Sequence, residues 1–237
     1  AHAAHRAGVP ATVCVPRSVD PAKLRGIRET GADVRVSEFP GYDETEDWAL
    51  GIAAEEGKKF LSAFDDADVM AANGGTIASE ILADAPDTGA FVLPVGGGGL
   101  AAGLSFLARE RDPGAVVVGC QHEGSPGLAL SLERGEAVTR LPAIETSAGG
   151  IEGGLGRLPF EILRTRIDRV ALVSEAEIED AVVWMVDRHG WLIEPSAAAA
   201  VAAVLSGRAG PFSAPVALVL TGRNVSVATV ARILGRA

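Results

Sequence analysis

The residues of this sequence best suited to hold a ligand are four consecutive glycines, Gly96, Gly97, Gly98 and Gly99. They follow an apolar run at residues 91–95, which predicts a buried parallel strand, and a helix-forming run begins at Leu100. Because successive glycines carry no Cβ, several backbone N–H groups can converge on one point. Backed by the positive end of a helix, such amides bind an anion, most often a phosphate. A tight turn that binds nothing is the alternative.

Composition excludes several classes of partner. The net charge is −10 and there is no basic run, so we expect no nucleic acid, whose phosphates require Lys and Arg. The longest apolar run, residues 197–205, is shorter than the roughly 20 residues of a membrane helix. The two cysteines, Cys14 and Cys120, lie in strand-like runs and predict buried thiols, with no disulfide and no metal spacing. We therefore expect a cytoplasmic protein.

Alternating strand-like and helix-like segments predict an α/β fold. Hydrophobic residues make up 48% of the chain and aromatic residues only 5%, which is typical of aliphatic strands between Ala-rich helices. The expected strands are residues 11–15, 33–37, 59–61, 91–95, 115–121, 170–173, 191–193 and 215–220. The expected helices are residues 21–30, 42–56, 70–83, 101–111, 126–134, 159–164, 174–188, 197–205 and 226–234. We expect two doubly wound parallel-sheet domains, residues 1–66 and 67–237.

Three further stretches allow more than one interpretation. The acids at positions 65, 66 and 68 could bind a cation, but helix capping is the simpler role. Residues 73–76 (NGGT) predict a kink or a passage between domains. Residues 146–156 hold five glycines and predict a loop packed against a ligand or a second glycine-rich backbone. Glu194 precedes Pro195 as a helix cap would, and capping is again the simpler role.

Two phosphate ligands are compatible with the glycine run. The spacing of Gly97, Gly99 and Gly103, with Glu123 about 20 residues later, partly matches a dinucleotide-binding turn and would indicate a nucleotide-binding oxidoreductase. Such a turn normally opens its domain, however, whereas a separate α/β unit comes before this one. Ligands of open α/β sheets lie at the carboxyl ends of the strands, where Thr221 also falls.

Six blocks of sequence, taken in order, resemble the fold-type II pyridoxal-phosphate enzymes of the tryptophan synthase beta-like superfamily, in the threonine/serine dehydratase branch. The blocks are residues 7–12 with 31–34, 64–66 with 75–81, 95–100, 173–178, 194–197 and 220–225. The most specific block is V-G-G-G-G-L at residues 95–100, which resembles the phosphate loop of the family. The resemblance covers essentially the whole chain.

The resemblance implies a cofactor site for pyridoxal 5′-phosphate. It assigns the phosphate to the backbone amides of the loop from Gly96 to Leu100, and the cofactor ring to Gly150. It places Glu194 close to cofactor and substrate, and Thr221 against the pyridine nitrogen. A neutral hydroxyl there makes the ring a weaker electron sink than an aspartate would, which suits β-elimination. The implied reaction releases water and ammonia from a hydroxy amino acid, leaving a 2-oxo acid, in a homodimer.

The chain departs from the family at its lysines. It contains only Lys23, Lys58 and Lys59, and none lies in the sequence context of the Schiff-base lysine. The resemblance places that lysine upstream of Ala1. The first residues read as the last turns of a helix that Gly8 ends, so we also expect an N-terminal truncation. The chain alone should then be inactive, with no catalytic lysine of its own. A non-catalytic remnant that binds phosphate is the remaining alternative.

Smaller departures concern the metal and the substrate. Gln121 lies where some members carry a glutamate that binds a divalent cation, so we expect no metal site. Gly149 replaces an aspartate and Arg223 replaces a glycine of the family pattern. The resemblance therefore leaves the particular hydroxy amino acid open.

Overall fold

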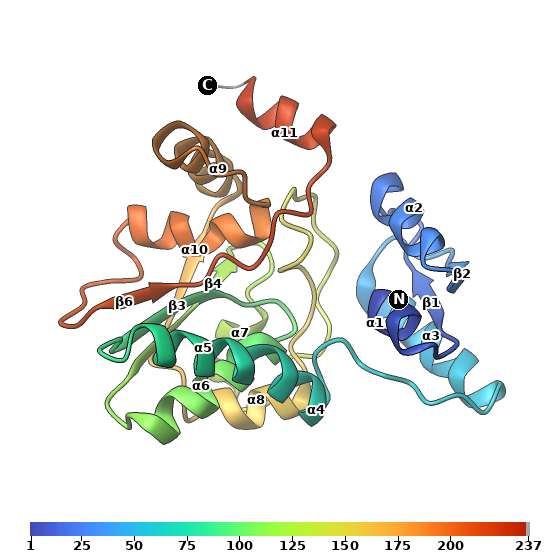
Figure 1. Cartoon of the computed structure of the whole chain (residues 1–237), viewed down its shortest axis with the longest axis horizontal. Helices are drawn as coiled ribbons and strands as arrows, with labels where there is room; N and C mark the ends of the chain where they lie inside the picture. The colour runs from blue at the N-terminus through green and yellow to red at the C-terminus, as the bar shows by residue number, and fades with distance from the viewer. Residues whose placement is uncertain (236–237) are drawn as a thin grey trace. The chain divides into compact units, whose positions relative to one another are not determined.

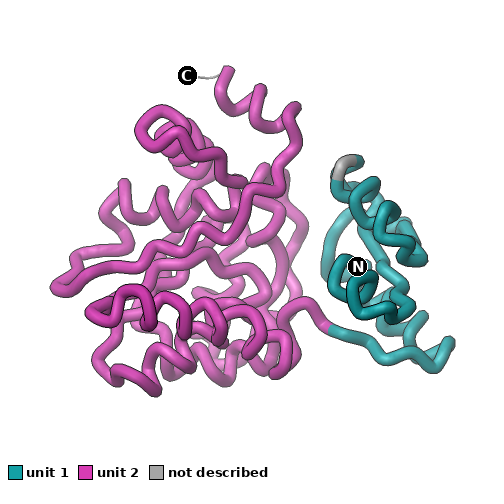
Figure 2. Tube along the Cα trace, viewed as in Figure 1, with its two compact units in different colours: residues 1–61 teal, residues 62–237 magenta. Residues whose placement is uncertain are grey.

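The computed structural model describes residues 1–235, except for the side chain of Ala22. The chain forms two compact units, Ala1–Leu61 and Ser62–Ala237 (Figure 2). The sequence placed this division after residue 66, whereas the structure draws it after Leu61. The reason is that Phe64 and Asp65 contact residues of the second unit.

The first unit is a small parallel α/β arrangement. Its elements are α1 (His2–Ala7), β1 (Thr12–Val15), α2 (Pro21–Glu29), β2 (Asp33–Val36) and α3 (Tyr42–Glu55). Strands β1 and β2 are parallel, with Thr12 opposite Asp33 and Val15 opposite Val36. Gly8 ends α1 in the left-handed conformation at φ 66°, which confirms the helix end expected there.

The second unit carries the larger sheet. Its first elements are α4 (Ala67–Met70), the π-helix η1 (Ala71–Gly75), α5 (Thr76–Asp84), β3 (Ala90–Pro94) and α6 (Gly99–Arg111). They are followed by β4 (Val116–His122), α7 (Gly127–Arg134), α8 (Arg157–Leu163), β5 (Arg169–Val173), α9 (Glu175–His189), α10 (Pro195–Leu205), β6 (Val216–Leu218) and α11 (Val227–Leu234). The four strands are parallel in the order β5-β4-β3-β6.

Helices cover both faces of this sheet. Alternate strand residues point to opposite faces, so Val92 and Val118 join the cluster with α9 and α10. Phe91 and Leu93 belong to the second cluster, with α5, α6 and α8. Figure 1 shows these two helical layers on opposite sides of the strands. The α/β fold expected from the sequence is confirmed, and its strands are aliphatic because both faces are buried.

The expected helix interruption at residues 73–76 is a π-helical widening within the second unit, not a passage between domains. The hydroxyl of Thr76 donates to the carbonyls of Ala72 and Asn73, both at 3.0 Å. Added Cβ atoms would lie 2.5 Å from the Leu104 nitrogen at Gly74 and 2.9 Å from the Gly75 nitrogen at Gly103. The π-segment and α6 therefore cross almost backbone to backbone, which fixes the helix that follows the glycine run.

Two strand predictions were wrong. Residues 59–61 and 191–193 are irregular, although both are apolar runs. Leu61 is 61% exposed and Trp191 is 60% exposed, so neither run has the buried surroundings that a strand of this sheet type requires. Among the described residues, no helix is both long and apolar enough to cross a membrane.

Candidate functional site

The glycine loop leaves the sheet at the carboxyl end of β3. The Val95 amide still donates to the Cys120 carbonyl at 2.8 Å, and the chain then turns away from the sheet. Gly98 has φ 90°, a conformation that side chains rarely adopt, and it is the N-cap of α6. Its carbonyl accepts from Ala102 at 2.8 Å, which starts the helix. The loop therefore delivers its amides to the N-terminus of a 13-residue helix.

The Cα side of this loop is covered by protein. An added Cβ would lie 2.7 Å from the Gly150 carbonyl oxygen at Gly96. At Gly97 and Gly99 it would meet Phe64, 2.6 Å from Cε1 and 2.8 Å from Cα respectively. These positions need glycine for packing as well as for any ligand.

The amide side of the loop is open to an anion. In the part of the chain that the structure describes, we find no hydrogen-bond acceptor for the backbone N–H groups of five successive residues, Gly96, Gly97, Gly98, Gly99 and Leu100. Such amides at a helix N-terminus attract negative charge. The loop thus fits a phosphate group, and the fit rests on backbone donors that need no basic side chain.

The second glycine-rich segment packs against the first. The Gly156 amide donates to the Gly97 carbonyl at 3.0 Å, and the Gly150 carbonyl lies against Gly96. On its other side, Gly150 donates to the Ser196 hydroxyl at 2.9 Å. Packing of residues 146–156 against a second glycine-rich backbone is therefore confirmed. Gly150 and the phosphate loop, both predicted as site residues, lie side by side.

Glu194 and Thr221 lie in segments that contact each other. The Glu194 amide donates to the Gly222 carbonyl at 3.0 Å, and an added Cβ at Gly222 would lie 3.2 Å from Glu194 Cδ. Thr221 follows β6, which pairs with β3 in parallel through Leu218 and Val92, so it emerges at the same edge as the glycine loop. Glu194 is the N-cap residue of α10, as expected, but its side chain makes no capping hydrogen bond to that helix.

Of the acids at positions 65 and 66, only Asp66 caps the helix that follows it, as expected. Asp66 accepts from the Val69 amide at 3.0 Å and caps α4. Asp65 accepts from the amides of Arg157 and Leu158 at 3.0 and 2.9 Å, so it caps α8 from far away in the sequence. Over residues 1–235 there is no cluster of three or more His, Cys, Asp or Glu side chains that could hold a metal ion.

Gln121 makes the hydrogen bonds that link β4 to α7. Its buried side-chain oxygen accepts from the amides of Leu128 and Ala129 at 3.0 and 3.1 Å, and its nitrogen donates to the Val95 carbonyl at 3.3 Å. The neutral side-chain amide of Gln121 thus provides an acceptor for two backbone amides in the first turn of α7. These contacts do not fit a divalent cation, which prefers several carboxylate or carbonyl oxygens.

The lysines and Cys14 lie in the first unit, and the buried thiol predicted for Cys14 was wrong, because that residue is only half-buried. Lys23, Lys58 and Lys59 are exposed in the first unit, and Lys58 donates to Thr12 Oγ1 at 2.8 Å and pairs with Glu56 at 2.7 Å. Burial raises the pKa of the Cys120 thiol to about 12, which keeps it protonated.

A polar cluster that the sequence patterns did not predict lies at the carboxyl ends of β4 and β5. His122 is 8% exposed, and its Nε2 lies 3.3 Å from Glu175 Oε2 without hydrogen-bond alignment. Glu175 also accepts from Thr146 Oγ1 at 2.6 Å and from the amide and hydroxyl of Ser147 at 2.8 and 2.5 Å. Burial would raise the pKa of Glu175, but these hydrogen bonds outweigh it and hold the pKa below its ordinary value. The usable signal was a glutamate two residues after the end of β5.

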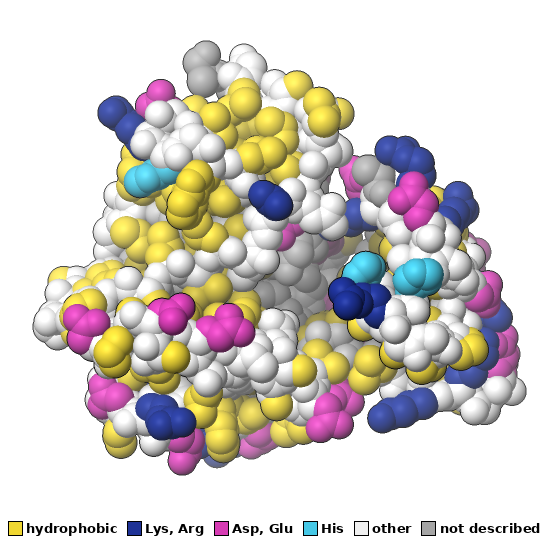
Figure 3. All heavy atoms as spheres, in the orientation of Figure 1, with side chains coloured by type: hydrophobic (Ala, Val, Ile, Leu, Met, Phe, Trp, Pro, Cys, Tyr) yellow, Lys and Arg dark blue, Asp and Glu magenta, His cyan; other side chains and the backbone are white. Residues whose placement is uncertain are grey.

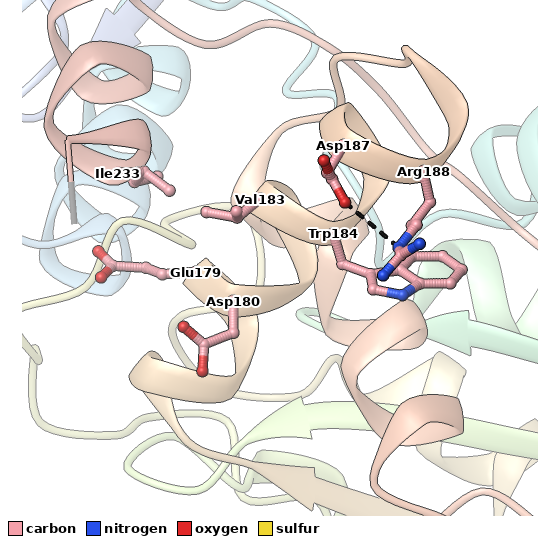
Figure 4. Close-up of a pocket in the computed structure, with 7 residues that line it drawn as sticks. All are labelled: Glu179, Asp180, Val183, Trp184, Asp187, Arg188 and Ile233. Atoms are coloured by element: carbon pink, nitrogen blue, oxygen red, sulfur yellow. Dashed lines mark ion pairs between the residues drawn. The ribbon is translucent and has the colours of Figure 1, made fainter. Parts of the chain in front are cut away.

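A separate groove lies between α9 and α11. It has a volume of about 460 Å³ and is lined by Glu179, Asp180, Val183, Trp184, Asp187, Arg188 and Ile233 (Figure 4). Figure 3 shows apolar side chains gathered on this part of the second unit. None of the site residues predicted from the sequence lines this groove.

Comparison with known proteins gives consistent matches. Residues 1–222 match the family model described as pyridoxal-phosphate dependent enzyme. The chain is 36% identical over 232 residues to L-threonine ammonia-lyase of Geobacter sulfurreducens, covering 97% of the chain and 56% of that protein. It is 32% identical to serine racemase of Rattus norvegicus, covering 97% of the chain and 69% of the relative. The solved structure of a threonine deaminase from T.th. matches with TM-score 0.83 and 35% identity, over 95% of the chain and 73% of that structure.

Proposed function

This chain belongs to the family of pyridoxal-phosphate dependent enzymes, with the α/β architecture of fold type II, and we propose that the whole protein is a dehydratase. It would release water and ammonia from a hydroxy amino acid and leave a 2-oxo acid. The observation that carries the proposal is the row of amides from Gly96 to Leu100 without acceptors in the described structure. The chain spans about 56% of the length of the two L-threonine ammonia-lyases it matches, so activity is proposed for the whole protein.

Different residues of the second unit would bind different parts of the cofactor. The amides of Gly96 to Leu100 would bind the phosphate, and Gly150 would border the ring, since its carbonyl lies against Gly96. When bound, pyridoxal phosphate supplies an electron-withdrawing ring that stabilises negative charge at the substrate α-carbon. Thr221 would offer the ring nitrogen a neutral hydroxyl, and Glu194 would place a carboxylate beside the same turn.

A neutral residue beside the ring nitrogen, Thr221, favours β-elimination over reactions that need a long-lived carbanion. Thr221 can donate or accept one hydrogen bond, but it brings no charge to hold a proton on the ring nitrogen. The site then favours substrates whose β-hydroxyl can leave as soon as negative charge develops at the α-carbon. The names of the relatives, which include L-threonine ammonia-lyase and serine racemase, support a small hydroxy amino acid as substrate. The alternative of a nucleotide-binding oxidoreductase loses its support, because the family match covers the same glycines.

The Schiff-base lysine is proposed to lie outside these 237 residues. Lys23, Lys58 and Lys59 are all exposed, and Lys58 is already paired with Glu56. A Schiff-base lysine in this chemistry needs an enclosed setting beside the cofactor, which these exposed side chains do not have. The homodimer and the cytoplasmic location expected from the sequence remain part of the same proposal.

The test is incubation with pyridoxal phosphate, reduction with borohydride, and peptide mapping. The proposal predicts saturable binding without stoichiometric labelling of any one lysine, because the phosphate site is present and its lysine is not. Stoichiometric labelling of Lys23, Lys58 or Lys59 would overturn the assignment of the lysine. No saturable binding would overturn the cofactor site itself. Pyridoxine 5′-phosphate, which has the phosphate but no aldehyde, is the matched ligand that measures binding to the phosphate site without formation of a Schiff base.

A further inference from the structure

We propose that Glu175 is a positioning residue that holds Gly150 against the phosphate-binding loop. The inference rests on the proposed function, because it assigns a purpose to the contact between Gly150 and Gly96. Glu175 is the first residue of α9, whereas Gly150 belongs to the glycine-rich loop before α8. Its effect on the site must therefore pass through residues 146–148.

The carboxylate of Glu175 fastens the start of the glycine-rich loop. Oε1 accepts from both the amide and the hydroxyl of Ser147, at 2.8 and 2.5 Å. Oε2 accepts from the hydroxyl of Thr146 at 2.6 Å. Hydrogen bonds to an ionised acceptor are stronger than neutral ones, so these three contacts fix two successive residues.

From Thr146 the contacts continue to Gly150. The Thr146 hydroxyl oxygen accepts from the Ala148 amide at 2.9 Å. The Ala148 carbonyl in turn accepts from Ile151 at 3.0 Å and closes a turn that contains Gly150. Two hydrogen bonds, from Thr146 to Glu175 and from Ala148 to Thr146, therefore connect this turn to Glu175.

There is little room for Gly150 to move independently. Its amide donates to Ser196 Oγ at 2.9 Å, and an added Cβ would lie 2.8 Å from the same oxygen. Its carbonyl would lie 2.7 Å from a Cβ on Gly96. Because both sides are in close contact, a shift of the turn would be transmitted to the phosphate loop.

His122 approaches the carboxylate of Glu175 from β4 without making a hydrogen bond to it. Its Nδ1 accepts from the Gly124 amide at 2.9 Å, which orients the ring so that Nε2 faces Glu175. That nitrogen lies 3.3 Å from Glu175 Oε2. The partners of Glu175 thus come from β4 and from residues 146–147, and none comes from its own helix.

Ordinary helix capping does not explain these contacts. The start of α9 already has a complete capping box, in which Ser174 Oγ accepts from the Glu177 amide at 3.3 Å and Glu177 Oε2 accepts from the Ser174 amide at 2.9 Å. Glu177 therefore caps the helix, whereas the side chain of Glu175 accepts hydrogen bonds from Thr146 and Ser147 of the loop. Glu177 also pairs with Arg208, and the described hydrogen bonds and ion pairs of its side chain go only to Ser174 and Arg208, which makes it the matched control.

The experiment compares four variants of this chain with the unmodified chain. Glu175→Gln keeps the shape but removes the charge and one acceptor, and Thr146→Val removes the connecting hydroxyl. Thr146→Ser restores that hydroxyl, and Glu177→Gln removes a charge from the same helical turn. Two quantities are measured: hydrogen–deuterium exchange of residues 146–151 without ligand, and the Kd for pyridoxine 5′-phosphate.

Glu175→Gln and Thr146→Val should speed exchange in residues 146–151 and raise the Kd by about tenfold, as expected for losing hydrogen bonds to a charged group. Thr146→Ser should restore both quantities to nearly the original values. Glu177→Gln should lower the melting temperature and leave both quantities unchanged.

The inference is overturned if Glu175→Gln leaves exchange and Kd unchanged, or if Glu177→Gln alters them equally. If the unmodified chain binds no pyridoxine 5′-phosphate, the proposed function fails separately. In that case hydrogen–deuterium exchange alone tests the role of Glu175. Faster exchange of residues 146–151 only in Glu175→Gln and Thr146→Val supports the positioning role. The same exchange rate in all variants overturns the positioning role.

Discussion

The carbonyl oxygen of Gly150 lies so close to Gly96 that a Cβ on Gly96 would approach it to 2.7 Å. Two glycine-rich loops from distant parts of the sequence thus meet backbone to backbone at the carboxyl edge of the sheet. A side chain on Gly96 would displace the loop of Gly150, whereas a side chain on Gly150 would meet Ser196 of α10. This contact links the proposed phosphate site to the proposed ring site.

Gly96→Ala should therefore damage both stability and ligand binding. The added methyl group must displace the backbone of residues 150–151, which we expect to lower the free energy of unfolding by about 1–3 kcal/mol. The Kd for pyridoxine 5′-phosphate should rise at least about tenfold, measured by calorimetric titration. Gly149→Ala is the matched control, because a Cβ at Gly149 meets nothing within 4 Å. Equal effects of the two substitutions would contradict the contact.

A negative charge in the loop should abolish binding. Gly98→Asp and Gly98→Asn impose the same strain, since φ is 90° and the added Cβ would lie 2.7 Å from Leu155 Cδ1. They differ in charge, so a phosphate site predicts much weaker binding in the aspartate variant than in the asparagine variant. Titration of both variants with pyridoxine 5′-phosphate measures the difference. If the two bind equally, the loop is not an anion site.

The hydrogen bonds to Glu175 predict a pH dependence of stability. Its pKa in the folded protein lies below the ordinary value of 4.5, so its contribution is fully present above that value. The contribution is lost as the pH falls through the lowered folded-state pKa. Urea unfolding at several pH values should show the chain and Glu175→Gln converging as the pH falls below 4.5. Parallel curves across that range would show that the carboxylate gains nothing from Thr146 and Ser147.

Divalent cations should have no effect at the start of α7. Gln121 already satisfies the amides of Leu128 and Ala129, so neither EDTA nor added Mg²⁺ is expected to shift the melting temperature. Gln121→Leu should cost about 1–3 kcal/mol of unfolding free energy, because it leaves buried amides without an acceptor. A drop in melting temperature on adding EDTA would show a cation site that these contacts do not reveal.

Short-range patterns predicted much of the fold and the position of the glycine loop in it. The apolar run of β3, the glycines after it and the helix that follows are adjacent in the sequence, and local propensity is sufficient to identify them. Residues 59–61 and 191–193 have a similar apolar pattern, but a strand also needs a neighbouring strand, which no local pattern reports. Gly150 was placed correctly beside a glycine-rich backbone because its own segment is unusually rich in glycine.

Contacts between distant residues could not be predicted in this way. Phe64 covers Gly97 from 33 positions earlier in the chain, and Asp65 caps a helix that begins at Arg157. Glu175 looked like part of a helix start, and only the folded chain shows that it contacts Thr146. Such partners are set by the order of strands in the sheet, which brings their ends to one edge.

The most direct test of the central claim is a two-dimensional 15N–1H NMR titration of this chain with pyridoxine 5′-phosphate, with NADH as the comparison ligand. The account predicts saturable shifts of the amides of Gly96, Gly97, Gly98, Gly99 and Leu100 with pyridoxine 5′-phosphate, and none with NADH. Unchanged loop amides, or larger shifts with NADH, would contradict a pyridoxal-phosphate site in this loop.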